Sequence, residues 1–544
     1  MNKLKNILIT LIAGVILIFL FQPVINYGFR DFPFILMVLI ALWIILNTKE
    51  QLFTVVGEQN IRFNFKNIGR IPIILLSILL LYITVFPAIS SWALFRSQDY
   101  RKLIGQVDVG KNLSNHMLPI SLDKIRVVDQ ELAQLLGDKV LGSQPALGSQ
   151  VRLGTFNIQK VNNELYWVAP LLHSGFFKWL SNSQGANGYV MVNATNERDV
   201  KLVQEVNGKS IYIKYQSEAF LFDNLKRYLY FKGYFFQGLT DYSFEIDDAG
   251  IPYWVVTKFK KTIGFSGDEA NGVIVLNAQT GEIKEYQIKD APAWIDRIQP
   301  ADFVETQLNN WGNFVEGYWN FSNENKLKIT EPVSMVYGDD NQAYWYTGLT
   351  SVGADESTVG FVLVNTRNKK AVWYKQSGAT EWAARNSAKG KVQEKGYSTS
   401  APIPYNINNI PTYVMTLKDN AGLVKMYAMV AIQDYTIVGV GNTLREALMS
   451  YKNVFNTTGN KINAKSKTVK NLITSVITRI NGDIKNGNTF YYFTLKKSKS
   501  IFVGSSQISN EFPLTTVGDS VEIQFDNDNQ DVIDVSSFVN KSIK

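Results

Sequence analysis

The chain has 544 residues, of which 19% are charged and 13% aromatic, and its net charge is +8. This length exceeds what one hydrophobic core supports, and the composition excludes a largely disordered chain, so several folded domains are expected. The chain has no cysteine, which excludes a disulfide framework, thiol catalysis and thiolate metal sites. The positive charge is spread thinly, so we interpret it as an ordinary solvated surface.

Three apolar stretches open the chain and predict membrane-spanning helices at about residues 7–25, 32–47 and 71–95, within an anchor of residues 1–98. A bilayer core needs about 20 apolar residues. The third stretch is long enough, and the first two are short but almost free of charge. We therefore expect a multi-pass plasma-membrane protein with three spanning helices. A two-helix hairpin with one interfacial segment is the alternative.

The basic residues near these stretches predict the orientation of the chain. Lys3 and Lys5 precede the first stretch, and the first connection carries only Arg30. The second connection is the more basic, with Lys49, Arg62, Lys66 and Arg70. Because basic loops stay in the cytoplasm, the N-terminus and the second connection should be cytoplasmic. Residues beyond about 96 should then form a large extracytoplasmic region, although three basic residues between 96 and 102 weigh against this.

A sequence motif recurs along the rest of the chain. In each copy an aromatic pair starts a strand, and a later apolar strand ends in Asn. The aromatic pairs are Tyr166-Trp167, Tyr253-Trp254 and Tyr344-Trp345, with a fainter fourth copy at Thr412-Tyr413. Self-similarity at a long period indicates duplicated structural units. We expect four repeat units, each a helix followed by a small antiparallel sheet, at residues 119–215, 216–299, 300–379 and 380–455. The tryptophans are interpreted as core residues.

Helical spacing of apolar residues predicts the helices of these units. They are expected over Ser121–Gly142, Ser217–Tyr234, Pro300–Phe314 and Thr443–Phe455, the last with Thr443 as its N-cap. The segment Asp99–Leu118, between the anchor and the first unit, is expected to be a linker.

The strand end Asn277–Ile283, which reads NAQTGEI, resembles the corresponding turn of PepSY-type domains. Two other units keep the turn but lose its Gly, at Asn193–Asn196 and Asn365–Asn368. The resemblance implies a helix followed by a small antiparallel sheet, placed outside the membrane. It also implies a domain that binds or restrains a partner.

After a polar linker at residues 456–470, residues 471–544 contain five short strands. The entry Val517–Val521 is similar to that of a strand in OB-like folds, so a small OB-like β-barrel is expected. The possible partner surface of this barrel consists of Tyr491, Lys496, Lys497 and Lys499. An aromatic run beside lysines resembles a nucleic-acid stacking strand, but strand alternation explains it better. Nucleic acid is therefore an unlikely partner.

The residues that could carry chemistry are sparse. His116 and His173 are the only histidines, and neither has an acidic residue at a recognised spacing. Acidic pairs such as Asp247-Asp248 stand where hairpin turns favour Asp, and the acidic run at 526–531 lacks the Gly and Glu of an EF-hand. We identify no catalytic, cofactor-binding or metal-ligating residue.

The sequence therefore predicts a membrane-anchored α+β protein with tandem repeats and a C-terminal barrel. Its expected function is that of a non-enzymatic extracytoplasmic scaffold or binding protein of the cell envelope, with the lipid bilayer and a protein as partners. A subunit of a membrane secretion or transport complex is the alternative, and an enzyme with unrecognised residues is a third. The absence of charge within the apolar stretches weighs against transport.

Overall fold

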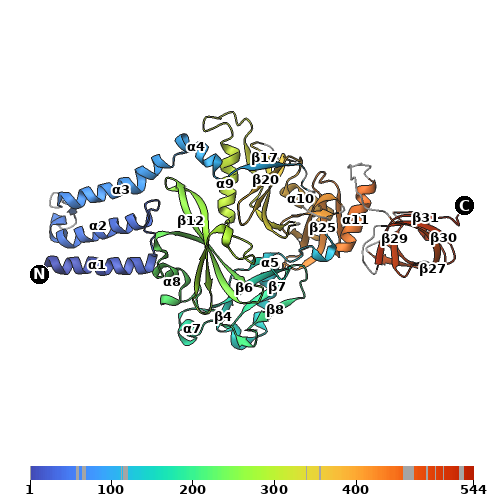
Figure 1. The fold of residues 1–544 in the computed structure, drawn as a ribbon, viewed down its shortest axis with the longest axis horizontal. Coiled ribbons are helices and arrows are strands. Elements are labelled where there is room, and N and C mark those ends of the chain that lie inside the picture. Colours follow the sequence, from blue (N-terminus) through green and yellow to red (C-terminus); the bar gives the residue numbers. More distant parts are fainter. Residues whose placement is uncertain are drawn as a thin grey trace.

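The computed structural model describes residues 2–56, 60–63, 69–111, 113, 120–338, 340–353, 357–407, 409–457, 471–485, 488–496, 498–506, 508–525 and 532–543. The fold is mixed α+β, as expected, and most of it consists of antiparallel sheets. Three N-terminal helices extend from one side of the folded region, and a barrel lies at the opposite end, so the two termini are far apart (Figure 1).

The N-terminal helices are α1 (Asn2–Phe21), α2 (Asp31–Leu52) and α3 (Arg70–Ser90), and a short hairpin of β1 (Phe53–Val56) and β2 (Asn60–Phe63) follows α2. By length and composition, Leu4–Phe21 and Arg70–Ser90 could cross a membrane, whereas the apolar part of α2 is shorter and spans Asp31–Asn47. Only 6% of each of the two long apolar segments is buried. Burial inside the folded region therefore does not explain their apolar surfaces.

Two predicted helix ends were wrong. The first helix ends at Phe21 rather than at residue 25, because Gln22 adopts φ +43° and precedes a proline, which disfavours helix. The third ends at Ser90 rather than at residue 95, and α4 (Ala93–Lys102) begins a new helix. At this break the Ser91 hydroxyl donates to the carbonyl of Ile263 and accepts from the amide of Phe265.

The predicted linker at residues 99–118 was also wrong in part. It contains the end of α4 and the strand β3 (Val107–Gly110), which pairs in parallel with β20 (Ala371–Tyr374). The segment that follows the apolar helices therefore forms one strand of a sheet whose other strands lie more than two hundred residues later in the sequence.

Four larger sheets form most of the folded region, and we number them in chain order. Two strand pairs, β9 (Glu205–Val206) with β10 (Lys209–Ser210) and β18 (Ser357–Thr358) with β21 (Gly378–Ala379), accompany them. Sheet 1 consists of β4 (Val151–Leu153), β5 (Asn157–Val161), β6 (Glu164–His173), β7 (Tyr189–Asn193) and β8 (Val200–Val203). Sheet 2 consists of β11 (Gly238–Ile246), β12 (Pro252–Ile263), β13 (Ser266–Asn277) and β14 (Ile283–Tyr286). Sheet 3 consists of β15 (Leu327–Ile329), β16 (Ser334–Tyr337), β17 (Ala343–Ser351), β19 (Gly360–Asn365), β20 and β3. Sheet 4 consists of β22 (Ser398–Thr399), β23 (Ile403–Ile407), β24 (Ile410–Lys418), β25 (Val424–Ala431) and β26 (Val438–Gly441).

A helix precedes each sheet in the chain. These helices are α5 (Gln130–Gly142), α8 (Leu225–Phe231), α9 (Ala301–Asn313) and α10 (Glu381–Lys391), and α11 (Leu444–Thr457) follows sheet 4. The first two are shorter than predicted. Asp129 caps α5 by accepting from the amide of Leu132, and Asn224 caps α8 by accepting from the amide of Arg227.

The aromatic pairs occupy equivalent positions in the sheets, because each indole makes the same hydrogen bond. Trp167 donates to the carbonyl of Val128 at 2.8 Å, Trp254 to Tyr215 at 2.7 Å and Trp345 to Gln299 at 2.8 Å. In sheet 4 the Tyr413 hydroxyl donates to the carbonyl of Ala379 at 3.4 Å. Each aromatic residue thus ties its sheet to the segment that leads into the preceding helix.

The sheets pack as two similar pairs. One core joins sheets 1 and 2 and includes Val168, Tyr189, Leu229, Trp254 and Ile274. A matching core joins sheets 3 and 4 and includes Tyr346, Phe361, Ala384, Tyr413 and Ala428. A third core, which contains residues of α5, α9 and both tryptophans 167 and 345, joins the two pairs. Central strands such as β6, β7, β17, β19 and β24 are buried on both faces for this reason.

The C-terminal residues form a closed barrel in the order β27-β28-β29-β31-β30. These strands are β27 (Asn471–Lys485), β28 (Asn488–Leu495), β29 (Ile501–Ser505), β30 (Ser520–Phe525) and β31 (Val532–Asn540). β27 pairs with both β28 and β30, and β29 runs parallel to β31. The guanidinium of Arg445, on α11, donates to the carbonyl of Val532 at 2.8 Å and so contacts the barrel.

Candidate functional site: a polar groove beside a buried acidic cluster

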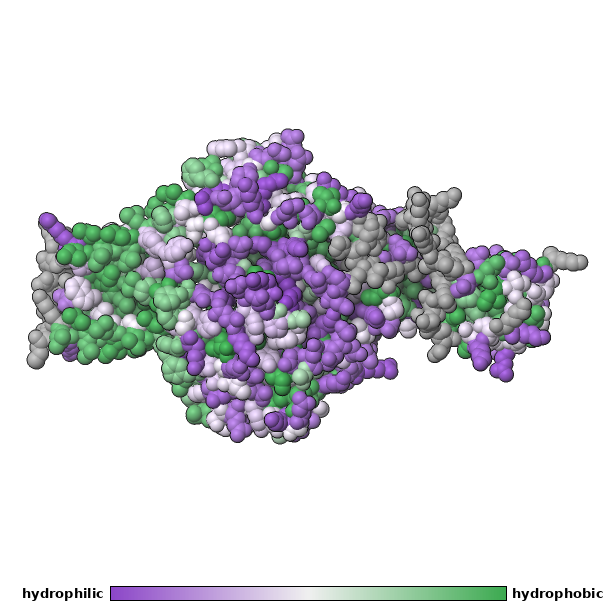
Figure 2. Space-filling model, viewed as in Figure 1, coloured by the Kyte–Doolittle hydropathy of each residue, from purple (hydrophilic) through white to green (hydrophobic). Residues whose placement is uncertain are grey.

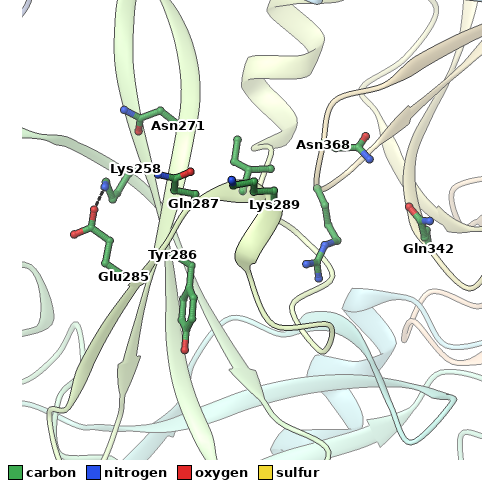
Figure 3. Close-up of a pocket in the computed structure, with 10 residues that line it drawn as sticks. Lys258, Asn271, Glu285, Tyr286, Gln287, Lys289, Gln342 and Asn368 are labelled. Carbon is green, nitrogen blue, oxygen red and sulfur yellow. Dashed lines mark hydrogen bonds and ion pairs between the residues drawn. The ribbon is translucent and has the colours of Figure 1, made fainter.

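A polar groove of about 870 Å³ lies between the edge of sheet 2 and the turns of sheet 3 (Figure 3). It is lined by Lys258, Asn271, Glu285, Tyr286, Gln287, Ile288, Lys289, Gln342, Arg367 and Asn368. Figure 3 shows Lys258 and Glu285 paired at one side, and Gln342 and Asn368 at the other. The groove is thus formed by strands and turns from two different sheets.

Arg367 holds one wall of the groove in place. Its guanidinium donates to the carbonyls of Ala291, Pro292 and Ile295 at 2.6, 2.7 and 2.6 Å. These carbonyls belong to the segment 287–298, which also contributes Gln287 and Lys289 to the groove. A guanidinium group donates several hydrogen bonds and accepts none. It can therefore bind several backbone carbonyls that are not paired within a sheet.

The groove suits a polar ligand. Asn271, Gln287, Gln342 and Asn368 carry amides that both donate and accept hydrogen bonds. Lys289 adds an exposed ammonium group, whereas the charge of Lys258 is balanced by Glu285. The chemistry fits hydroxyl-rich or anionic groups better than apolar ones.

A buried acidic cluster lies where sheets 1, 2 and 3 meet, and the sequence analysis did not predict it. It contains Asp241, Glu245, Asp296, Arg297 and Tyr337. Arg297 forms an ion pair with Asp241 at 3.0 Å. Asp296 accepts from the backbone amide of Lys160 at 2.7 Å and from the Tyr337 hydroxyl at 3.1 Å. The cluster therefore connects strands from three sheets through polar contacts.

Glu245 is the most perturbed member of this cluster. Only 3% of the residue is exposed, and one carboxyl oxygen accepts from the Ser243 hydroxyl at 2.7 Å. The other oxygen has no hydrogen-bond partner among the described residues. Burial raises the pKa of Glu245 to about 8, against the opposing effect of Arg297. Burial also raises the pKa of Asp296. At neutral pH Glu245 is therefore largely protonated.

The structure describes three of the four residues of the predicted partner surface. Lys496 and Lys499 are exposed. The ring of Tyr491 instead stacks on that of Phe512 with centroids 5.4 Å apart and packs against the barrel core. Lys497 lies outside the described residues. Tyr491 therefore contributes packing to the barrel.

The structure describes only some of the other residues considered from the sequence. His116 and the acidic run at 526–531 lie outside the described residues. His173 is buried, both of its ring nitrogens lack a hydrogen-bond partner in the described part of the chain, and burial lowers its pKa. Asp247 accepts from the amides of Ala249 and Ile251, which is a turn function. The described residues contain no group of three or more acidic or histidine side chains that could hold a metal ion.

Replacing Arg367 with Gln is expected to loosen the wall of the groove, because three short hydrogen bonds to carbonyls are lost. A charged hydrogen bond contributes about 1.5–3 kcal/mol, and these bonds act on one segment, so we expect a local loss of about 3 kcal/mol. Hydrogen exchange of the amides in 287–298 should accelerate accordingly.

Arg198 provides the matched control, because it lies exposed near the corresponding turn of sheet 1. Exchange in 287–298 should be unchanged in Arg198→Gln. Equal exchange in the two variants would contradict the role assigned to Arg367.

Comparison with known proteins does not identify the chain. It matches no protein-family model and no curated protein sequence. Among solved structures, a crystal structure of the polysaccharide lyase Uly1 aligns with 63% of this chain and 74% of that chain, at 8% identity and a TM-score of 0.15. A TM-score this low carries no argument about fold or function.

Proposed function

We propose that the protein is a non-enzymatic, membrane-anchored scaffold or binding protein whose folded region stands on the outer surface of the plasma membrane. In this proposal α1, α2 and α3 all lie in the bilayer, and residues beyond about 96 are extracytoplasmic. A protein or another component of the cell envelope would bind to the folded region, with the polar groove as the candidate site.

The observation that carries the proposal is the tight attachment of the apolar helices to sheet 2 and its helix. The guanidinium Nε of Arg227 donates to the carbonyl of Phe19 at 3.1 Å and its charge lies 4.3 Å from the Phe19 ring centre. The Tyr230 hydroxyl donates to the carbonyl of Pro23 at 3.1 Å. The amide of Ile25 donates to the carbonyl of Phe235 at 2.8 Å. The first bond occupies a carbonyl in the last turn of α1, and the other two hold the segment that follows the helix. This favours a fixed attachment over a flexible tether.

Exposed aromatic residues lie close in sequence to the ends of the apolar helices and in the segment that binds Ile25. Tyr27, Trp92, Phe95 and Phe236 have exposed fractions of 83%, 48%, 67% and 55%. Aromatic belts of this kind are typical of the level where a membrane helix meets the lipid headgroups. Figure 2 shows that the apolar surface is concentrated on the three helices, while polar residues cover most of the folded region in this view.

We also propose that the barrel is of the OB type and that the repeats are PepSY-like. The barrel has the strand order 1-2-3-5-4 with strand 1 paired to strand 4, which agrees with a five-stranded Greek-key barrel. The two repeat pairs would then hold this barrel away from the membrane and present it to a partner.

The absence of cysteine allows a direct test of the proposed topology. Single substitutions Asn2→Cys and Leu423→Cys place one thiol at the N-terminal end of α1 and one in the exposed turn before β25. A membrane-impermeant maleimide should label Leu423→Cys in intact cells and Asn2→Cys only after permeabilisation.

The opposite labelling pattern would show that the folded region is cytoplasmic. Recovery of both variants in the soluble fraction would contradict the anchorage itself. The unsubstituted chain is the control for background labelling, because it has no thiol.

A further inference from the structure

An apolar surface outside the three helices continues from the end of α1 onto the folded region. It comprises α7 (Phe176–Ser181) and the short helix η4 (Leu221–Asp223) with the residue before it, and we call it the aromatic foot. Its exposed members are Phe176, Phe177, Leu180, Phe220, Leu221 and Phe222, with exposed fractions of 44%, 79%, 59%, 38%, 55% and 56%. Six large apolar side chains on two short helices are more than the scattered exposure that soluble surfaces show.

Ring contacts join the foot to α1. Phe222 lies 5.8 Å from Phe19 and 5.6 Å from Phe231, measured between ring centres. Phe19 is near the C-terminal end of α1, and Phe231 is 47% exposed. The foot is therefore continuous with the helix that could cross the membrane, and it lies on the side of the folded region that faces α1 (Figure 1).

The foot is held as one unit rather than as loose side chains. Phe176 and Phe220 make an edge-to-face contact at 5.1 Å, which joins α7 to the segment before η4. Trp179 packs against Phe220 at 5.6 Å, and its indole donates to Asp223 at 3.1 Å. Leu221 adopts φ +49°, a conformation that costs energy in a leucine and directs an apolar side chain outward. This packing holds the side chains of Phe177 and Leu180 in exposed positions.

We propose that the aromatic foot inserts into the headgroup and upper acyl region of the outer leaflet, so that the folded region rests on the bilayer as well as being anchored in it. This inference rests on the proposed function, since it requires α1 to span the membrane. The chemistry suits lipid, because aromatic rings favour the interface and Lys178, on the same helix, can reach lipid phosphates. Two contacts with the bilayer, the helices and the foot, would fix the tilt of the folded region.

The test again uses the cysteine-free chain. The full-length protein carrying Phe177→Cys or Leu180→Cys, labelled with an environment-sensitive fluorophore, is reconstituted into vesicles of phosphatidylcholine with some phosphatidylglycerol. Lipids with a spin label near the headgroup should quench both fluorophores strongly, and lipids with the label at the chain end should quench them weakly. Val15→Cys on the exposed face of α1 and Leu514→Cys in the barrel are the matched controls, with exposed fractions of 69% and 67%.

Val15→Cys should be quenched most by the deep label, and Leu514→Cys by neither. Quenching at Val15 without quenching at Phe177 and Leu180 would overturn the foot while leaving the anchorage intact. Lack of quenching at Val15 would instead overturn the proposed function. The fluorophore at position 177 could instead report an apolar environment that depends on the protein-to-lipid ratio and not on the spin-labelled lipid. That result would mean that the foot contacts a second copy of the chain, and it would also overturn the proposal.

Discussion

Replacing Trp254 with Ala is expected to destabilise sheet 2 by about 3–5 kcal/mol, the usual cost of removing a buried Trp side chain. Trp254 is 6% exposed and lies in the core shared by sheets 1 and 2. The substitution leaves a cavity beside Phe244, whose ring centre is 5.4 Å away, and it deprives the carbonyl of Tyr215 of its donor. Hydrogen exchange of the amides in β12 and β13 should accelerate, because local exchange reports the stability of that unit.

Two variants separate the contributions and provide the control. Trp254→Phe retains most of the packing but loses the indole hydrogen bond, so a loss of about 1 kcal/mol is expected. Trp319→Ala removes an indole that is 68% exposed, and its effect should stay within about 0.5 kcal/mol. If Trp254→Ala retained native protection but lost binding to a partner, the residue would belong to a binding site and the core assignment would be wrong.

The repeat units could be recognised from the sequence through their recurring aromatic-pair motif. In three units the indole of a Trp donates a hydrogen bond to a backbone carbonyl of the segment before the helix. This bond requires a Trp at the same position of each strand, so the repeat can be recognised in the sequence at Trp167, Trp254 and Trp345. The turns were predictable for a similar local reason. Asn162 and Asn163 adopt φ +50° and +67° between β5 and β6, which Asn tolerates better than most residues.

The features that sequence reasoning missed depend on contacts between distant segments. The strand β3 follows the apolar helices, and its pairing with β20 is decided by a strand some two hundred and sixty residues later. The helix starts at Gln130 and Leu225 were missed because the residues before them bond to distant turns. The amides of Val127 and Val128 donate to the carbonyl of Ala194, and those of Lys214 and Tyr215 donate to the carbonyl of Ala278. Local periodicity contains no information about such partners.

The candidate sites were missed for the same reason. In β11 the residues Ser243–Ile246 alternate between polar and apolar, a pattern that predicts an exposed Glu245. All four are nevertheless buried, because both faces of sheet 2 are covered. Arg367 reads as an ordinary turn residue until the segment 287–298 folds against it. A charged side chain within a strand is the one signal that could have drawn attention to Glu245, since such residues are almost never fully buried unless paired.

Glu245 is expected to make the protein less stable as pH rises from about 4.5 to about 8. The folded state keeps the proton up to a pKa of about 8, whereas the unfolded chain releases it near the ordinary value of 4.5. Within this window the unfolded state binds fewer protons, so the free energy of unfolding falls with pH. Below the window the group contributes no pH dependence, and above it the loss is complete. A shift of this size corresponds to at most about 5 kcal/mol.

Glu245→Gln removes the titrating proton and keeps the shape of the side chain and an acceptor for Ser243. We therefore expect the variant to be more stable than the unsubstituted protein at pH 8 and similar to it at pH 4.5, as measured by hydrogen exchange in β11 with a correction for intrinsic exchange rates. Glu205→Gln on the exposed strand β9 (Glu205–Val206) should leave the pH profile unchanged. If Glu245 were instead ionised and stabilised by Arg297, its folded pKa would lie below the ordinary value of 4.5. The free energy of unfolding would then be constant through this window and fall only below it, and Glu245→Gln would destabilise the protein at pH 8. The direction of the difference at pH 8 thus decides whether the junction of the three sheets holds a neutral acid or a buried ion pair.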